Sequence, residues 1–490
     1  MMVKMKIRHI LIVLGACVLF PACDFLDEYD PNAVTVGNYY ESEADIVATL
    51  NGVYTSLTQS YIANNIHYFS DIRAQATKVI DSGQNSGIPY QFYNYTLTEE
   101  NSYVFNRYSQ LYKLIARANN LFAHLDDVSY ADPTSREMYE AEAKFLRALA
   151  YFYLVTEWGD VPLVLRELED VDDVKANNYR QPKANVYAAI FDDLKCVVES
   201  PLPDVQPASQ CGKVSKTAAW ALWGKALLHY ALDDDFAASK SANLTEAIGK
   251  LETAWGLRKF GELTEIPYHE IWDLATQKSC AENIFQINYV QGNAELGSTW
   301  NYAWGPRETG ITSQRTGGTG NFTTQEVYDS FEAGDIRQSY LRATSYTGQT
   351  YYHTMKFVDL ECGSDGYGGN NWIVLRYADV ALMLAEAYYW SDNDTEAKQW
   401  LNKVRARAGL EEWSGNDLRQ GIYDERLHEF MHEGLRWQDL LRMYSDAEMI
   451  EHFSAINPNF SEKDLLLPIP YKERNLNPEG MYQNPGYGAN

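Results

Sequence analysis

The segment 428–432 reads H-E-F-M-H, the spacing H-E-x-x-H. On a helix this spacing places His428 and His432 on one face with the Glu429 carboxylate beside them, which is the arrangement that zinc peptidases use. The longer metzincin pattern has a glycine where this chain has Leu435, and no helix of the N-E-x-x-D type follows. A motif of five residues also matches often by chance, and an amphipathic helix facing the core explains it. We therefore expect no metal site here, with a zinc hydrolase as the competing hypothesis.

Aromatic residues are the second group that could do chemistry, and the chain has 36 Tyr and 12 Trp against 18 Phe. Flat rings flanked by amides suit a sugar, whose C–H face stacks on a ring while its hydroxyls bond to polar side chains. Trp300, Tyr302 and Trp304 alternate, so an extended segment would place all three on one side. Large aromatics are mostly buried, and we expect about half of these rings to cover the core. The candidate ligand-binding residues are Tyr90, Tyr93, Trp300, Asn301, Tyr302, Trp304, Tyr367 and Trp372.

Other catalytic patterns are missing from the sequence. There is no G-x-S-x-G, no P-loop and no G-x-G-x-x-G. The 67 acidic residues allow many carboxylate pairs, so no glycosidase pair stands out. The segment 392–394 reads D-N-D but lacks the glycine of an EF-hand, and the turn of a helical hairpin explains it. We expect a binding protein with no catalytic residue and no cofactor.

The formal net charge is -26. An acidic surface repels phosphate backbones, so binding to nucleic acid is a poor hypothesis for this chain.

The first residues predict export. Three basic residues precede an apolar run from Ile10 to Phe20, followed by Pro21, Ala22 and Cys23. This run is too short to span a membrane and is typical of a signal peptide over residues 1–22. We expect lipidation at Cys23, because cleavage before the alternative, Cys17, would shorten the apolar run. Residues 23–40 would then form a lipidated tether that holds the protein on a membrane surface.

Four further cysteines, Cys196, Cys211, Cys280 and Cys362, are widely spaced and contain no C-x-x-C pair. An exported protein could form zero, one or two disulfides from them, and the sequence does not determine the pairing.

The elements that must position these residues are mostly helices. Apolar residues recur at helical spacing from Glu137 to Trp158 and from Lys216 to Leu232. The clearest helical hairpin combines a stripe from Leu375 to Tyr389 with a returning stripe from Ala397 to Ala408, and it is similar to a tetratricopeptide unit. No regular 34-residue period extends through the chain. Further helices are expected around Ser42–Gln59, Val104–Leu125, Val186–Glu199 and Glu246–Trp255.

Residues 261–374 differ from these helical blocks, since Gly, Asn, Thr and Ser are frequent and short β-like runs lie between them. The expected fold is mainly α, with degenerate tetratricopeptide-like hairpins and a loop-rich, partly β insertion that binds the ligand. The expected division of residues 41–490 is a helical scaffold at 41–260 and 375–445, a binding region at 261–374 and a C-terminal segment at 446–490.

Several stretches together resemble one family. They are C-D-F-L-D at 23–27, EAKFLRALAYFYLVTEWGDVPLV at 142–164, LRYADVALMLAEAY at 375–388, ERLHEFMHEGLRWQDLL at 425–441, and the PIP and QNPGY of residues 467–487. In combination they resemble the SusD/RagB family, surface lipoproteins of Bacteroidetes-type bacteria. The H-E-x-x-H segment falls inside the family's E-x-x-x-E-G-x-R-W-x-D-L block, which makes a zinc site still less expected.

The resemblance implies a helical protein that is lipid-anchored to the outer membrane and exposed on the cell surface. Members bind glycans, or in some cases peptides, and act as the lid of a SusC-type TonB-dependent transporter without cleaving bonds themselves. We therefore expect a protein that captures oligosaccharide and delivers it to such a transporter, with a peptide-binding role as the alternative. The family's ligand contacts lie in variable loops, so the resemblance assigns no binding residue here.

Overall fold

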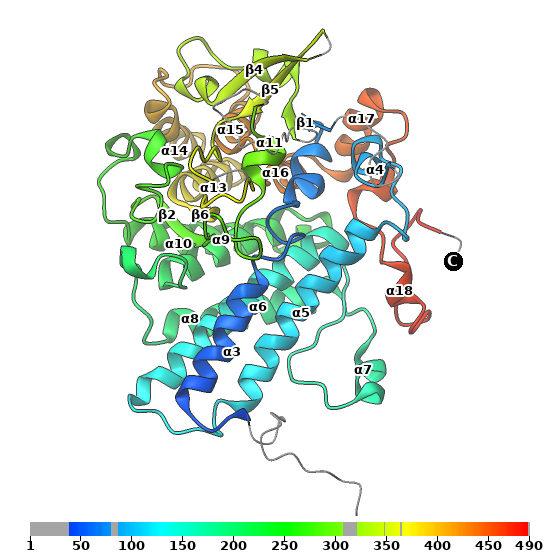
Figure 1. Ribbon diagram of the computed structural model, residues 1–490. Coiled ribbons are helices and arrows are strands. Elements are labelled where there is room, and N and C mark those ends of the chain that lie inside the picture. Colours follow the sequence, from blue (N-terminus) through cyan, green and yellow to red (C-terminus); the bar gives the residue numbers. More distant parts are fainter. Residues whose placement is uncertain (1–38, 80–86, 307–320, 347, 363–364, 489–490) are drawn as a thin grey trace, which may run out of the picture.

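The computed structural model describes residues 39–79, 87–306, 321–346, 348–362 and 365–488. Helices dominate this part of the chain, with two small sheets (Figure 1). The expectation of a mainly α fold is confirmed. None of the described helices combines the length and the low polarity that crossing a bilayer requires. Among the described residues, Cys196, Cys211, Cys280 and Cys362 form no disulfide with one another.

The first helical block is a series of packed helices. It consists of α3 (Glu43–Ser56), α5 (Ser102–His124), α6 (Pro133–Trp158), α8 (Lys183–Glu199), α9 (Lys216–Leu232) and α10 (Lys240–Gly256). Consecutive members from α5 to α10 lie against one another, and α3 lies against α5 and α6. At the contact of α9 with α10, a Cβ on Gly224 would lie 2.5 Å from Cγ of Leu251, so this close approach requires glycine.

Local sequence explains the ends of α6. The Asp132 side chain accepts from the backbone N–H of Thr134, and Pro133 occupies the first turn, where its missing N–H costs nothing. The helix ends at Gly159, whose φ of +73° is unfavourable for other residues. The chain then leaves as extended backbone, and Val161 pairs with Gln181. The helix predicted to end at Trp158 is confirmed.

The second helical block begins with strand β6 (Trp372–Arg376), which continues directly into α13 (Tyr377–Trp390). Helix α13 packs against α14 (Asp394–Arg407) and α10, which confirms the predicted hairpin. Leu375 belongs to the strand rather than to the helical stripe, because β6 pairs with β2 (Asn283–Ile287). The block continues with α15 (Leu418–Phe430), α16 (Arg436–Met443), α17 (Asp446–Ile456) and α18 (Tyr471–Arg474).

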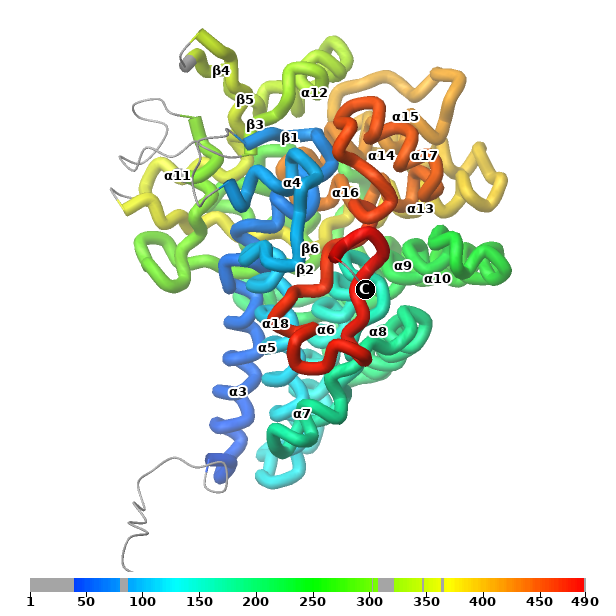
Figure 2. The backbone as a smooth tube through the Cα atoms, turned by 90° about the vertical axis from the view of Figure 1, so that its right-hand side faces the viewer, coloured from blue at the N-terminus to red at the C-terminus, as the bar shows by residue number. Residues whose placement is uncertain are grey.

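A second, antiparallel sheet has the strand order β1-β3-β5-β4. Its strands are β1 (Thr77–Lys78), β3 (Phe322–Thr323), β4 (Leu341–Tyr346) and β5 (Gln349–Thr354). This sheet and α4 (Tyr90–Asn94) lie at one end of the molecule, and the first residues of α3 lie at the opposite end (Figures 1 and 2). Strands from distant parts of the sequence therefore meet at the end far from residue 39.

The remaining helical segments are short. They are α7 (Val171–Asn177), α11 (Trp300–Trp304), α12 (Gln325–Asp329), the π-helix η1 (Tyr68–Ile72) and the 3-10 turns η3 (Ala208–Gln210), η4 (Asp234–Ser239), η5 (Leu263–Glu265), η6 (Tyr268–Ile271), η7 (Ile336–Tyr340) and η8 (Glu462–Leu465).

Candidate functional site

The tryptophans nominated for sugar stacking lie in the core. Residues 300–304 form the helical turn α11 instead of an extended segment, so the alternation of Trp300 and Trp304 does not place them on an exposed side. Their exposed fractions are 0% and 1%. Trp300 packs against Tyr289, Phe357 and Trp372, with ring centroids 4.9 to 5.3 Å apart. The nomination of the two tryptophans is corrected: a loop rich in small residues needs its own apolar centre, and these indoles provide it.

The neighbouring candidates have similar surroundings. Asn301 is fully buried, and its Oδ1 accepts from the backbone N–H of Asp359 at 3.0 Å. Trp372 is 2% exposed and stacks on Phe357. Neither side chain is open to a ligand, so these two nominations are also corrected. Tyr367 is half-buried, and the side chain of Tyr302 lies outside the described residues.

The tyrosines of α4 have a different environment. Tyr90 and Tyr93 are both half-buried, and their ring centroids lie 5.8 Å apart at an interplanar angle of 32°. The backbone is held in place because the side chain of Gln75 donates to the carbonyl of Tyr93 at 2.7 Å, and the helix ends at Tyr95 in the left-handed region, with φ of 55°. Partial burial raises the pKa of the Tyr93 phenol, with smaller contributions from Tyr90 and Glu326, so the hydroxyl is protonated and can donate to a ligand.

Strand β1 of the antiparallel sheet follows Gln75, the residue that holds α4, and lies close to α4 (Figure 2). The ammonium of Lys78 on β1 lies 5.9 Å from the ring centroid of Tyr351 on β5, a cation–π distance. The ring of Tyr352 stacks on Tyr328 of α12 at 3.9 Å. Tyr351 and Tyr352 are themselves buried, at 8% exposure each, so we call the half-buried tyrosines of α4 together with Lys78 the tyrosine surface. Sequence reasoning missed Lys78, since only strand pairing brings residue 78 close to residue 351.

The H-E-x-x-H segment does not form a metal site. Helix α15 ends at Phe430, and His432 has a φ of +66°, so the two imidazoles do not share one helix face. Nε2 of His428 is 2.8 Å from Oγ of Ser330, and Nε2 of His432 is 2.8 Å from Oγ1 of Thr323. Among the described residues, no group of three or more His, Cys, Asp or Glu side chains could hold a metal.

Glu429 instead belongs to a buried ion network. Its Oε1 accepts from Arg376 at 2.5 Å and from Arg407, and its Oε2 accepts from Arg337 at 3.0 Å. Burial opposes the charged form, but the guanidinium groups of Arg407, Arg376 and Arg337 hold the pKa of Glu429 well below its ordinary value. A carboxylate neutralised by three cations cannot act as a general base, so its role is structural.

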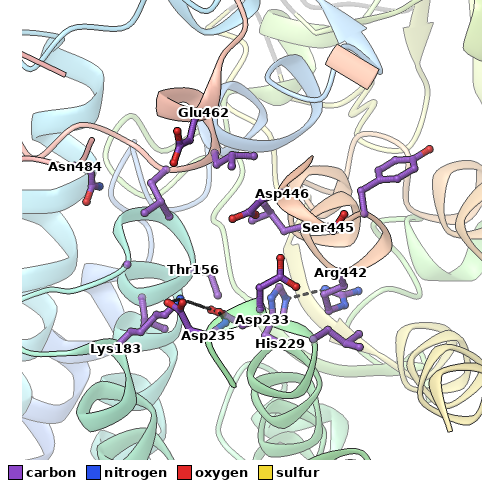
Figure 3. Close-up of a pocket in the computed structure, with 18 of the residues that line it drawn as sticks. Thr156, Lys183, His229, Asp233, Asp235, Arg442, Ser445, Asp446, Glu462 and Asn484 are labelled. Carbon is purple, nitrogen blue, oxygen red and sulfur yellow. Dashed lines mark hydrogen bonds and ion pairs between the residues drawn. The ribbon is translucent and has the colours of Figure 1, made fainter. Parts of the chain in front are cut away.

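A cavity of about 220 Å³ lies between α9 and the C-terminal part of the chain (Figure 3). Lys183 binds Asp233 at 2.7 Å and Asp235 at 2.6 Å, and Arg442 donates to His229 at 2.7 Å. Asp446 and Glu462 also line it. Burial and the surrounding aspartates raise the pKa of Asp446. The three cationic residues of the lining are all paired: Lys183 with Asp233 and Asp235, Arg442 with Glu386 and Asp439, and Lys463 with Asp464, so the arrangement shows no specific ligand chemistry.

Known proteins resemble the whole chain. Two family models match it: the SusD family over residues 297–487, and a family described as starch-binding associating with outer membrane over residues 24–228. SusD-like protein P2 of Formosa agariphila is 27% identical, with 99% of this chain and 100% of that protein covered.

Solved structures of SusD-like proteins are also similar to this chain. A laminarin binding SusD-like protein has 26% identity and a TM-score of 0.76, covering 91% of this chain and 100% of the other. A SusD superfamily protein from Parabacteroides distasonis has 23% identity and a TM-score of 0.77, covering 93% and 100%, and this likeness concerns the fold. The helical architecture, the two family matches and the full-length relatives agree, and the chain belongs to the SusD family.

Proposed function

We propose that this protein is a surface lipoprotein that binds oligosaccharide and delivers it to a SusC-type TonB-dependent transporter. The observation that carries the binding role is the pair of half-buried tyrosines on α4, at the end of the molecule far from residue 39, where Lys78 of β1 also lies (Figures 1 and 2). A relative at 26% identity is a laminarin binding SusD-like protein, which supports a glycan as the ligand class.

Binding would follow from the chemistry of the tyrosine surface. The faces of Tyr90 and Tyr93 offer apolar area to the C–H face of a sugar, and their protonated hydroxyls can donate to its oxygens. The Lys78 ammonium lies beside Tyr351 and adds a hydrogen-bond donor. A pair of stacked aromatic rings contributes about 0.5–1.5 kcal/mol, and with a similar contribution from each ring to a sugar, Tyr90 and Tyr93 support only moderate affinity for one sugar unit. This suits a protein that must release its ligand to a transporter.

The binding role is tested with a panel of oligosaccharides that begins with laminarihexaose, measured by calorimetry. We expect at least one neutral oligosaccharide to bind, and the double variant Tyr90→Ala/Tyr93→Ala to lose about ten- to a hundredfold in affinity, since two stacked rings are removed. Tyr471 is exposed on α18, and Tyr471→Ala is the matched control. Binding of peptides and of no glycan would favour the alternative role.

The anchoring proposal rests on the sequence alone, because Cys23 lies outside the described residues. Lipidation at Cys23 would hold the protein at the outer membrane, and the family model for residues 24–228 is described as associated with that membrane. Cys23→Ser is expected to move the protein from the membrane fraction to the soluble fraction and to abolish incorporation of labelled palmitate. Unchanged fractionation and labelling would contradict this site.

Delivery to a transporter requires a physical partner. Native membranes solubilised in mild detergent are expected to yield a complex with a TonB-dependent outer-membrane protein. A lid mechanism further requires that ligand binds more tightly to the closed complex than to the open one. A protein that purifies from its native membranes without such a partner would contradict the delivery role.

A further inference from the structure

A groove of about 360 Å³ lies on a part of the molecule that shares no residue with the tyrosine surface. Three distant segments form it: the C-terminal half of α3 with the residues just after it, the loop 209–213, and β2 with the turn that follows. Its volume falls in the range of about 300–1,000 Å³ that is typical of small-molecule sites. The lining residues are Asn51, Tyr54, Thr55, Leu57, Thr58, Ser209, Gln210, Cys211, Gly212, Lys213, Gln286, Ile287, Asn288, Val290 and Leu296.

The loop that forms one wall is fixed by hydrogen bonds. The side chain of Asn288 donates to the carbonyl of Cys211 at 2.6 Å, and its Oδ1 accepts from Asn371 at 2.9 Å. Gly212 has a φ of +86°, and a Cβ there would lie 2.6 Å from Nδ2 of Asn288, so only glycine allows this approach. The groove is therefore shaped before any ligand arrives, which lowers the entropic cost of binding.

The charge of the groove differs from that of the chain as a whole. No carboxylate lines it, although the chain contains 67 acidic residues against 41 basic ones. Its one ammonium, on Lys213, lies 3.2 Å from Oε2 of Glu142 and 4.3 Å from the ring centroid of Tyr54. The Tyr54 hydroxyl also donates to Glu142, at 2.5 Å. Since this charge is compensated, the groove offers an ionic ligand no net attraction.

Uncharged hydrogen-bonding groups remain available. Gln286 lines the groove but is only 4% exposed, so its side chain belongs to the wall and is not within reach of a ligand. The side-chain amides of Asn51 and Gln210 are exposed and form no hydrogen bond with another described residue. Val290 is 49% exposed and Leu296 is half-buried, and these two side chains supply accessible apolar area in the groove. Amides alternating with aliphatic surface complement a molecule that carries hydroxyls around a C–H framework.

We propose that this groove is a second carbohydrate site, which takes a unit of a neutral oligosaccharide. The exposed amides of Asn51 and Gln210 would bond to its hydroxyls, and the exposed side chain of Val290 would contact its C–H face. The inference concerns the same class of ligand as the proposed function, but it depends on separate residues. A long glycan bound at two places would dissociate more slowly than from either alone.

The thiol of Cys211 provides a direct readout, because it is half-buried in the groove wall. The full folded chain is alkylated with a maleimide, and the rate at each cysteine is measured by mass spectrometry of the peptides. Cys196, which is also half-buried but lines no part of the groove, is the internal control. The probes are laminarihexaose, maltohexaose and cellohexaose, titrated to about 20 mM, well above the millimolar dissociation constants of weak sites.

We expect at least one probe to lower the Cys211 rate about tenfold near saturation, because an occupied groove shields the thiol, while the Cys196 rate is unchanged. Protection should persist in Tyr90→Ala/Tyr93→Ala and disappear in Asn51→Ala/Gln210→Ala. Both positions of the latter variant are exposed, and its urea unfolding midpoint should equal that of the parent chain.

Two results would overturn the inference. One is a Cys211 rate that no probe changes, and the other is protection that disappears when the α4 tyrosines are removed, since that would place the ligand elsewhere. Both are distinct from failure of the proposed function. Calorimetric binding that depends on Tyr90 and Tyr93 without protection of Cys211 refutes only the second site. Protection of Cys211 that is unaffected by the tyrosine variant, without tyrosine-dependent binding, refutes only the tyrosine surface.

Discussion

The tryptophans of α11 and the tyrosines of α4 are similar side chains in opposite environments. Trp300 and Trp304 lie in the core and contact other rings on several sides, whereas Tyr90 and Tyr93 are half-buried and keep part of each ring open. Both pairs lie on five-residue helices. The comparison teaches that aromatic content near a loop does not identify a binding surface, because loops that lack aliphatic residues use the same rings to build a core.

A second contrast concerns the buried contacts that hold the two parts of the molecule together. The first helical block packs closely at contacts such as that of Gly224 with Leu251, and its buried ion pairs, Arg107 with Glu157 and Arg147 with Asp193, each join one arginine to one carboxylate. The loop-rich part and β6 instead meet α15 through a buried network in which Arg337 and Arg376 share the carboxylate of Glu429. Buried ion pairs gain little over apolar packing, but removing one member is costly. The four predictions below test the division between structural and binding residues.

The largest effect is expected for Glu429→Ala. The variant leaves Arg337, Arg376 and Arg407 without a shared carboxylate in a buried site, which should lower the free energy of unfolding by about 3–5 kcal/mol. Urea unfolding followed by circular dichroism measures it. Glu451 is exposed on α17, and Glu451→Ala is the matched control with an expected change below about 0.5 kcal/mol. If Glu429→Ala and Glu451→Ala have the same free energy of unfolding, the ion network around Glu429 does not stabilise the fold.

Trp300→Ala separates the core rings from the binding rings. Because Trp300 is fully buried, the substitution creates a cavity and should cost about 3–5 kcal/mol of stability. Tyr90→Ala/Tyr93→Ala should cost clearly less, since both rings are half-buried, and should instead reduce glycan affinity. Stability and calorimetric affinity are measured on both variants. If Trp300→Ala keeps the stability of the parent chain and loses only glycan affinity, the assignment of Trp300 to the core rather than to the binding surface is wrong.

Tyr93→Leu and Tyr93→Phe sharpen the description of the tyrosine surface. If the ring stacks on a sugar, leucine should lower affinity about tenfold and phenylalanine should retain most of it, because only the former removes the aromatic face. Calorimetry with the oligosaccharide found in the panel gives both values. Equal losses in the two variants would show that the hydroxyl, and not the face, contacts the ligand.

The smallest effect concerns pH. Burial, and secondarily Arg337 and Arg436, lowers the pKa of His428 to about 3 from an ordinary value of 6.5. The folded state therefore favours the neutral ring, and this contribution to stability is present above pH 6.5 and is lost as the pH falls toward 3. Between pH 6 and pH 5 the advantage of the parent chain over His428→Gln should shrink by about 1 kcal/mol.

Urea unfolding at several pH values measures this difference. His269 is exposed, so His269→Gln should leave the pH dependence unchanged. Parallel pH profiles for the parent chain and His428→Gln would mean that His428 is not the buried neutral group described here.

Sequence periodicity predicted much of the scaffold. The helix ending at Trp158 and the hairpin of α13 and α14 both carry apolar residues at helical spacing with a recognisable stop, and local chemistry suffices to place such elements. The candidate site could be predicted from the sequence only in small part. Nothing local distinguishes Tyr93, which keeps part of its ring open, from Trp304, which does not, since exposure depends on which distant segments cover each ring.

The sequence by itself determined the helical class, the acidic character and the family. Each of these depends on composition, spacing or short motifs, which are properties of neighbouring residues. Only the tertiary structure decided that α11 is buried, that Glu429 pairs with three arginines rather than a metal, and that Lys78 meets Tyr351. These outcomes depend on contacts between residues tens to hundreds of positions apart, and burial and charge pairing exist only after such segments come together.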